Sequence, residues 1–352
     1  MRVLLAPDSY GGFCSAVAAC AFVGPRLKAR GLRVSDHPMA DGGEGFLSVL
    51  GHHAGLAPSA EAWRRHGDVV AIESARLLGR ESPGMQRPCL DRSSHALGRL
   101  LIDLEAAGEA GPYLVGLGGT STLDGGVGAL AALGLVPLDS EGRRMEAPIT
   151  GADLERVHRI VGDPPLAGTV VALLADVRTP IVEAPRRFGL QKGLPANRVG
   201  RVEAMLHRWA GVLAAWREEN GLPPLPVNLA GGGAAGGLGY ALAVATGGPI
   251  REGAPWVART TGLEAAMDGA DVVITGEGRL DATSFEGKVV ETVLRTARRV
   301  GSIRVAALVG EAHALPPGGP DLVEVAGSPP DLGRFLAAAD RLAARLAEPA
   351  SC

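Results

Sequence analysis

Seven carboxylates stand at or just beyond the ends of short apolar segments in this 352-residue chain. They are Asp8, Asp41, Glu44, Asp124, Asp176, Glu277 and Asp281. Taken singly, each has the position of a helix-capping or turn residue. Gathered in one crevice, they would form a strongly negative site that needs a compensating cation. Magnesium carried by a nucleotide would supply it, because Mg²⁺ prefers one or two carboxylates together with phosphate oxygens and water. A remaining carboxylate could accept the proton of an attacking hydroxyl.

A glycine-rich segment, residues 118–126, has the features of a phosphate cradle. It reads Gly118-Gly119-Thr120-Ser121-Thr122-Leu123-Asp124-Gly125-Gly126 and lies between an apolar run and a predicted helix over 127–133. Glycines let backbone N–H groups turn toward a ligand, and a helix N-terminus adds about half a positive charge. The hydroxyls would supply further donors. The alternative is an ordinary glycine-rich turn in which Asp124 caps the helix.

Lysine is rare in this chain, which marks its few occurrences as candidates. Among 35 basic residues, only Lys28, Lys192 and Lys288 are lysine. Lys192 lies in Gln191-Lys192-Gly193, and Lys288 follows Gly287 at a predicted helix start. Both are candidates for phosphate or carboxylate contacts, where a compact ammonium is useful. An ordinary surface lysine is the alternative for each of them.

A second glycine pattern favours a different class of protein. Gly231-Gly232-Gly233-Ala234-Ala235-Gly236 fits the Gly-x-Gly-x-x-Gly pattern of dinucleotide-binding oxidoreductases. The preceding residues 227–230 are a poor strand, and the nearest downstream acid, Glu252, does not end a convincing second strand. Glycines that allow close helix packing explain the pattern better. There is no P-loop, Gly-x-Ser-x-Gly or His-Glu-x-x-His motif.

The candidate residues follow a repeated alternation of apolar runs and helix-period segments. The runs 1–6, 34–40, 113–117, 170–175, 271–274 and 303–309 each end in an acid or a glycine cluster. Continuous apolar runs are typical of strands buried on both faces, and their alternation with helices predicts a mostly parallel sheet. In such sheets the ligand crevice lies beyond the carboxyl ends of the strands. Helices are predicted over 15–30 and, with an amphipathic pattern, over 331–347.

Length and composition bear on the number of domains and argue against several classes of protein. The chain is long enough for two domains, and apolar residues make up 46% of it. A net charge of −3 without a basic run argues against a nucleic-acid surface. Cys14, Cys20, Cys89 and Cys352 match no zinc or redox spacing, which favours reduced thiols and a cytoplasmic location. The uncharged stretch 222–250 is rich in proline, glycine and alanine, so we expect a buried helix with its leading loop and no membrane span.

Several motifs, in order along most of the chain, resemble the bacterial glycerate kinase family that lacks a P-loop. The N-terminal motifs are Ala6-Pro7-Asp8-Ser9-Tyr10 and Ala40-Asp41-Gly42-Gly43-Glu44-Gly45. The segment 118–126, Asp176-Val177, Gln191-Lys192-Gly193 and the segment 233–239 follow. The most specific motif is Ile274-Thr275-Gly276-Glu277-Gly278-Arg279-Leu280-Asp281, which is followed by Gly287-Lys288.

The resemblance implies an α/β fold of two domains with the active site in the cleft between them. A Rossmann-like domain would comprise 1–62 and 250–352, and an inserted α/β domain would comprise 63–249. The implied reaction transfers the γ-phosphoryl group of ATP, with Mg²⁺, to a hydroxyl of D-glycerate or a closely related small hydroxy acid. The expected partners are therefore the hydroxy acid and ATP, with no nucleic acid and no membrane, in a monomer or homodimer.

Within that reaction we expect positioning and charge neutralisation to carry most of the catalysis. Asp176 and Asp281 are the candidates for binding the metal or acting as base, and Lys192 and Arg279 would neutralise charge. The substrate side would comprise Asp8, Ser9, Asp41, Gly42, Gly43 and Glu44. The nucleotide side would comprise Gly118, Gly119, Thr120, Ser121, Asp124, Gly125, Gly126, Gln191, Gly276, Glu277, Gly278 and Lys288.

Departures from the family pattern, which include a changed segment at Asp91–Gly98, leave alternatives open. Gly11 stands where the family usually has lysine, Leu123 where it usually has asparagine, and residues 183–187 replace a glycine- and proline-containing stretch. If the missing lysine binds a carboxylate or phosphate, its loss should cost about 2–3 kcal/mol. A changed substrate, or a weak or inactive paralogue that binds nucleotide or acid, therefore stays possible beside the NAD(P) oxidoreductase.

Overall fold

The computed structural model describes residues 1–301, 303–313, 317–327 and 331–348. The chain divides into two compact units. Unit 1 comprises Met1–Asp41, Ser48–Ser59 and Gly253–Cys352, and unit 2 comprises Gly42–Leu47 and Ala60–Glu252. The predicted boundaries lie at 62/63 and 249/250. The chain instead crosses between the units at 59/60 and 252/253, and also at 41/42 and 47/48. The sequence gives no sign that the short segment Gly42–Leu47 belongs to unit 2.

Unit 1 is built on a parallel five-stranded sheet in the order β12-β11-β10-β1-β2. Its elements are β1 (Arg2–Leu5), α1 (Ala16–Ala29), β2 (Arg33–Asp36), α2 (Phe46–His53, in this unit from Ser48), α9 (Gly253–Thr261), α10 (Leu263–Ala266), β10 (Val272–Leu280), the 3-10 helix η7 (Ala282–Phe285), α11 (Val289–Val300), β11 (Arg304–Ala312), β12 (Leu322–Val325) and α12 (Leu332–Ala347). Numbered by their sequence within this sheet, the strands have the spatial order 2-1-3-4-5. This doubly wound order reverses direction between β1 and β10, where such folds bind ligands.

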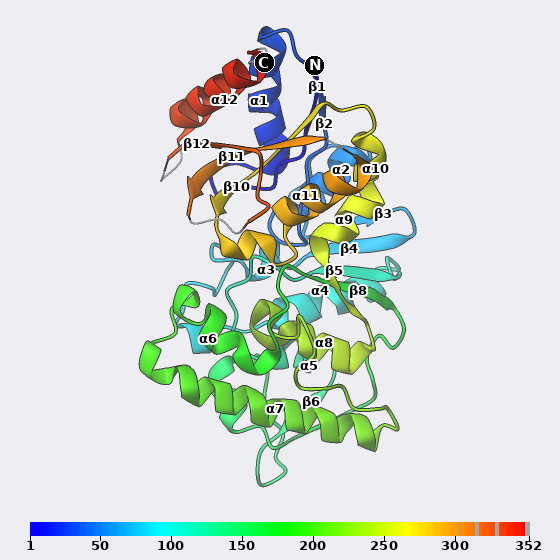
Figure 1. Cartoon of the computed structure of the whole chain (residues 1–352). Helices are drawn as coiled ribbons and strands as arrows, with labels where there is room; N and C mark the ends of the chain where they lie inside the picture. Colours follow the sequence, from blue (N-terminus) through cyan, green and yellow to red (C-terminus); the bar gives the residue numbers. More distant parts are fainter. Residues whose placement is uncertain (302, 314–316, 328–330, 349–352) are drawn as a thin grey trace. The chain divides into compact units, whose positions relative to one another are not determined.

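Helices cover both faces of this sheet. Helices α1 and α12 lie side by side on one face, and α9, α10 and α11 gather on the other (Figure 1). Under α1 and α12 the core includes Val3, Leu5, Ile274, Leu308 and Phe335. The predicted helices over 15–30 and 331–347 are confirmed as α1 and α12. The side chains of Ser15 and Asp331 cap them by accepting bonds from the N–H groups of Ala18 and Arg334.

In unit 1, two differences from the predicted strand lengths change where candidate residues lie. The strand expected over 34–40 ends at Asp36, so Asp41 follows a loop rather than a strand end. The strand expected over 271–274 continues to Leu280, through Gly276, Glu277 and Gly278. Gly276 pairs with Leu308 there, and a Cβ on Gly276 would lie 2.0 Å from the Leu308 carbonyl oxygen. The glycine permits close strand packing, a role that a local sequence pattern does not distinguish from a loop.

Unit 2 contains a second five-stranded sheet, in the order β3-β4-β5-β8-β9. Its strands are β3 (Trp63–His66), β4 (Val69–Glu73), β5 (Tyr113–Gly116), β8 (Val170–Ala175) and β9 (Ile250–Glu252), with a separate pair of β6 (Val136–Leu138) and β7 (Arg159–Val161). Strands β3 and β4 pair in antiparallel fashion, and the other pairs of the five-stranded sheet are parallel. The carboxyl ends of β4, β5 and β8 therefore share one edge, which carries Glu73, the segment after Gly116 and Asp176.

The helices of unit 2 are mostly short. The α-helices are α3 (Ala75–Leu78), α4 (His95–Ala106), α5 (Val127–Ala132), α6 (Ala184–Phe188), α7 (Val199–Glu219) and α8 (Leu238–Thr246). The 3-10 helices are η1 (Cys89–Asp91), η2 (Gly151–Glu155), η3 (Ile181–Glu183), η4 (Leu190–Lys192), η5 (Ala196–Arg198) and η6 (Ala234–Gly237). Every residue of α8 is buried, as expected for the uncharged stretch 222–250. Among the described residues, no helix is long and apolar enough to span a membrane.

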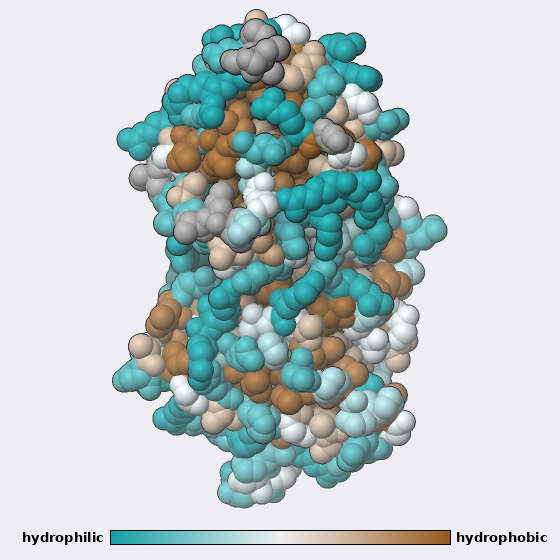
Figure 2. Space-filling view, viewed as in Figure 1, coloured by the Kyte–Doolittle hydropathy of each residue, from teal (hydrophilic) through white to brown (hydrophobic). Residues whose placement is uncertain are grey.

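The surface and the cysteines agree with the composition. Figure 2 shows hydrophilic side chains interspersed with smaller apolar areas on the visible face. Cys14, Cys20 and Cys89 are free thiols, as expected. Burial raises the pKa of Cys14 to about 11, which keeps this thiol protonated near neutral pH. The expectation for Cys352 lies outside the described residues.

Candidate active site

In unit 1, Asp8 and Glu277 lie at the switch point of the parallel sheet. The chain leaves β1 and continues alongside β10, so that the N–H of Asp8 donates to the Gly276 carbonyl at 2.8 Å. Asp8 Oδ1 accepts from the N–H of Ser9 at 2.7 Å. Within the described residues, Glu277 Oε1 is buried and has no hydrogen-bond partner. A buried carboxylate oxygen of this kind can accept a bond from a group outside the described residues, such as a ligand or water.

Asp41 and Lys288 complete the charge distribution around these two carboxyls. Burial raises the pKa of Asp8 well above its usual range; Asp41 and Glu277 raise it further, and Ser9 and Lys288 oppose them. Burial also raises the pKa of Glu277 to about 7, with a further rise from Asp41, although Ser284 and Lys288 lower it. We call Asp8, Asp41 and Glu277 the acidic trio, because the charge of Asp41 disfavours the ionised forms of both Asp8 and Glu277.

The raised pKa of Glu277 predicts a pH-dependent stability. The folded-state pKa of Glu277 lies above its usual value of 4.5, so its contribution is fully present below the unfolded pKa and is lost as pH rises through about 7. Between about pH 5 and pH 8, we expect this group to lower the free energy of unfolding by about 2 kcal/mol. Thermal unfolding across this range, compared with Glu277→Gln, measures the effect. An equal slope in the variant would contradict the assignment.

Asp281 forms hydrogen bonds with Thr283 and an ion pair with Arg279. Asp281 Oδ1 accepts from the N–H and the hydroxyl of Thr283, and Oδ2 lies 3.2 Å from Arg279 Nε. Burial alone would raise the pKa of Asp281, but these bonds and the charges of Arg279 and Lys288 lower it. Asp281 thus caps η7, which is the alternative that the sequence left open, and both its oxygens are engaged. A lowered pKa also disfavours it as a general base.

In unit 2, the segment Gly42–Leu47 is held at the carboxyl edge of the sheet by Glu73. Glu73 is 2% exposed, and its two oxygens accept from the N–H of Gly45 at 3.0 Å and of Leu47 at 2.9 Å. Arg76 lies 3.4 Å from the same carboxylate. Gly42 adopts φ +87°, and a Cβ there would lie 2.7 Å from Leu174 Cβ. Gly42 is thus a packing residue and not an open substrate contact, whereas Glu44 is exposed.

The first part of the predicted cradle, residues 118–121, follows β5 at this same edge. A Cβ on Gly118 would lie 2.8 Å from Gly43 Cα and 3.4 Å from Asp176 Cγ, so only glycine permits this approach. Gly119 is exposed with φ +74°, and Thr120 Oγ1 is buried without a hydrogen-bond partner among the described residues. Ser121 is buried, and its N–H donates to the Leu78 carbonyl. Gly118–Thr120 beside Asp176 therefore forms a compact candidate contact surface.

The second part of the predicted cradle is buried, which corrects the expectation for Asp124, Gly125 and Gly126. Asp124 is 0% exposed, and its oxygens accept from Ser94 N, Ser94 Oγ, Gly126 N and Gly128 N. Its own carboxylate thus occupies the start of α5 that was expected to receive a phosphate. Gly125 packs against Trp209 and Gly126 against Ala241. The capping alternative describes this segment better.

Lys192 lies in the interior of unit 2, whereas its neighbour Gln191 is exposed. The Lys192 ammonium donates to the Thr122 carbonyl at 3.0 Å. Burial lowers its pKa to about 8, although the negative groups Asp176 and Asp124 act in the opposite direction. A buried ammonium with a depressed pKa is typical of a functional lysine.

Two residues that hold these segments were not singled out from the sequence. Glu73 ends β4, and Arg92 donates at 2.9 Å to the carbonyls of both Ser121 and Lys192. Glu73 could have been found from the sequence, because it ends an apolar run as the other candidate acids do. Arg92 gives no comparable signal, since its partners are distant backbone oxygens.

The dinucleotide alternative is contradicted by the surroundings of Gly231–Gly236. In the described chain, residues 221–230 directly before them form no strand, and Gly231–Gly236 are all buried. A Cβ on Gly236 would lie 2.2 Å from the Thr122 carbonyl oxygen, and one on Gly233 would lie 2.6 Å from that of Pro180. The glycines serve packing against neighbouring backbone, and a pyrophosphate has no access to them.

Comparison with known proteins agrees with this picture. The family model described as the glycerate kinase family matches residues 3–349. The glycerate 2-kinase of Escherichia coli is 32% identical over 85% of this chain and 82% of its own, and the glycerate kinase of Haemophilus influenzae is 31% identical over 85% and 83%. A crystal structure described as glycerate kinase 2 from Salmonella typhimurium LT2 has a TM-score of 0.72 and 28% identity over 98% of both chains. The chain therefore belongs to the glycerate kinase family and is a kinase-type phosphotransferase.

Proposed function

We propose that this chain transfers the γ-phosphoryl group of ATP, as its magnesium complex, to a hydroxyl of D-glycerate or a closely related small hydroxy acid. The observation that carries the proposal is the acidic trio at the switch point of unit 1, where the pKa values of Asp8 and Glu277 are raised. Carboxylates in this state are suited to a cation or to the proton of an attacking hydroxyl. The relatives named above support the choice of substrate.

The donor set fits a magnesium ion that arrives with a nucleotide. Among the described residues, no group of three His, Cys, Asp or Glu side chains is arranged to hold a metal ion alone. Mg²⁺ usually binds through one or two carboxylates together with substrate phosphates, so a complete protein cage is not required. The acidic trio in unit 1 and Asp176 in unit 2 are the carboxylates available for this role. When bound, Mg²⁺ would neutralise charge on the transferring phosphoryl group.

The chain's own groups would then act by position and charge. A proton from the attacking hydroxyl would pass to Glu277 or Asp8, whose raised pKa values make them better acceptors than Asp281. In unit 2, Lys192 and the segment Gly118–Thr120 would contact phosphate oxygens.

An assay of ADP release tests the proposed function directly. We expect ADP production that requires both D-glycerate and Mg²⁺, with lower rates for L-glycerate, glycolate and D-lactate. Removal of Mg²⁺ with a chelator should abolish the signal, and adding it back should restore it. ATP binding without turnover on any hydroxy acid would favour the inactive paralogue.

The family's missing lysine gives a second test. Gly11 is exposed with φ +51°, and a Cβ there would meet nothing within 4 Å. Gly11→Lys therefore has room, at a backbone cost of about 1 kcal/mol for the left-handed conformation. If position 11 is where charge is lacking, Gly11→Lys should lower a substrate KM by about tenfold. Gly11→Asn is the matched control, because asparagine tolerates this conformation and adds no charge. Equal KM values in the two variants would show that position 11 is not where a positive charge is lacking.

A further inference from the structure

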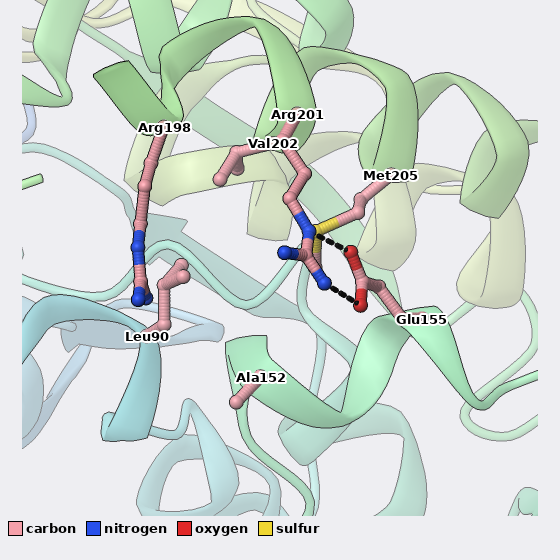
Figure 3. A pocket seen from close by; sticks show the side chains of 7 residues that line it. All are labelled: Leu90, Ala152, Glu155, Arg198, Arg201, Val202 and Met205. Carbon is pink, nitrogen blue, oxygen red and sulfur yellow. Dashed lines mark hydrogen bonds and ion pairs between the residues drawn. The ribbon is translucent and has the colours of Figure 1, made fainter. Parts of the chain in front are cut away.

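A pocket outside the candidate active site lies between η1, η2 and the start of α7 in unit 2. It has a volume of about 180 Å³ and is lined by Leu90, Ala152, Glu155, Arg198, Arg201, Val202 and Met205 (Figure 3). None of these residues belongs to the sets assigned above to substrate, nucleotide or metal. The pocket thus needs an explanation of its own.

The charged residues of the pocket leave one cation without a partner. Arg201 and Glu155 form a two-pronged pair, with Arg201 Nη2 at 2.5 Å from Glu155 Oε2. Hydrogen bonds from Arg201 lower the pKa of Glu155, and the charge of Arg208 acts in the same direction. Within the described residues, the Arg198 guanidinium has no hydrogen-bond or ion-pair partner. Since Glu155 is already neutralised, the pocket carries a net positive charge that favours an anion.

The other side chains give the pocket an apolar wall beside its charged groups. Val202 and Met205 project from the first turns of α7, and Leu90 of η1 lines the same pocket (Figure 3). Val202 is 1% exposed and Met205 is 6% exposed, so this wall is part of the packed core and not a surface irregularity. For comparison, a cavity of about 150 Å³ suffices to bind benzene. A ring or short branched chain therefore fits beside the wall.

We propose that this pocket binds a small carboxylate with an apolar body of about the size of a benzene ring. The carboxylate would pair with Arg198, whose planar guanidinium suits a two-pronged contact, and the apolar body would lie against Leu90, Val202 and Met205. Inorganic phosphate satisfies the charge without the apolar wall, and a neutral aromatic amide satisfies the wall without the charge. These two molecules are therefore informative comparison ligands.

Calorimetric titration of the full-length protein with sodium benzoate tests the proposal. We expect saturable benzoate binding and at least about tenfold weaker binding of both inorganic phosphate and benzamide. Binding should persist with saturating D-glycerate and MgATP present, which separates this pocket from the candidate active site. Loss of benzoate binding under those conditions, or equal binding of benzamide, would overturn the proposal. Phosphate binding as tight as benzoate would also overturn it.

Variants locate the site. Arg198→Gln should weaken benzoate binding about tenfold, because one charge-assisted contact is lost. Ala152→Phe fills the pocket from an exposed position of η2 and should weaken binding at least as much. Arg99→Gln is the matched control, since it removes an exposed arginine of α4 that pairs with Asp103. Unchanged affinity in both pocket variants, or an equal loss in the control, would contradict the site.

Discussion

Asp8→Asn should lower kcat/KM at least about 100-fold and at the same time raise the midpoint of thermal unfolding. The loss of activity is of the size expected when a proton acceptor or a metal-binding carboxylate is removed. The gain in stability has a separate cause. Burial and the neighbouring Asp41 and Glu277 raise the pKa of Asp8, which means that its ionised form is disfavoured in the folded protein. Asparagine removes that charge and retains an oxygen for the N–H of Ser9.

The sign of the stability effect follows from linkage. Asp8 contributes stability below its unfolded pKa and loses that contribution as pH rises through its higher folded pKa. As pH rises through the raised folded pKa of Asp8, the wild-type protein therefore carries the cost of the ionised form, and the variant does not. The difference between the two proteins should shrink as pH falls.

Asp281→Asn is the matched control for this experiment. The pKa of Asp281 is lowered because bonds from Thr283 and the charge of Arg279 outweigh the effect of burial. Its ionised form is thus favoured in the folded protein, and asparagine should lower the melting temperature. Differential scanning calorimetry and ADP-release kinetics on both variants give the comparison. If Asp8→Asn lowers stability as Asp281→Asn does, Asp8 is a structural acid and its place in the site is wrong.

The sequence was informative where a pattern has a single physical meaning. The run 170–175 became β8 with the predicted bounds, because six consecutive residues of this kind favour a strand in a parallel sheet. The amphipathic pattern over 331–347 became α12. Phe335, Ala339, Leu342 and Leu346 are buried as expected, whereas Leu336, expected on the same side, is only half-buried. The fold class could therefore be predicted, since it rests on the order of such elements.

The sequence was ambiguous where one residue type serves two purposes. Glycine permits both a phosphate cradle and close backbone packing, and the contacts that decide between them are distant in sequence. Gly276 meets Leu308, and Gly125 meets Trp209, so both are packing glycines. An aspartate near a helix start serves equally as a cap, and Asp124 has all four of its bonds within unit 2. Glu73 was missed because its role depends on hydrogen bonds from Gly45 and Leu47, which are distant in sequence.

Lys192→Met should also lower activity while it raises stability. Here the substitution removes a buried positive charge, whereas Asp8→Asn removes a negative one. Lys192 is 9% exposed, and burial lowers the pKa of its ammonium from 10.5 to about 8. Such a shift corresponds to about 3 kcal/mol of cost for the charged form. Methionine fills a similar volume without that cost but loses the bond to the Thr122 carbonyl, worth about 1 kcal/mol. At about pH 7 we expect a net gain of about 1–2 kcal/mol in stability.

The same depressed pKa gives Lys192 a signature in the pH profile. The folded pKa lies below the unfolded one, so the unfolded chain binds more protons between about pH 8 and 10.5, and wild-type stability should rise across that window. Activity should fall across the same window, because the phosphate contacts proposed for Lys192 require the ammonium. We therefore expect kcat/KM to fall above about pH 8, and we expect the alkaline limb of kcat to lie at higher pH because bound phosphates favour the charged form.

In Lys192→Met, kcat/KM should fall at least about 100-fold, the loss expected for one preorganised donor, and the alkaline limb should disappear from the residual activity. Lys28→Met removes an exposed lysine of α1 and should leave both the rate and the limb unchanged. A variant at position 192 that is less stable and retains the limb would show that Lys192 only supports the backbone at Thr122. A more stable variant that is inactive would show the reverse: the folded chain keeps a buried positive charge at a cost because the phosphoryl group needs it.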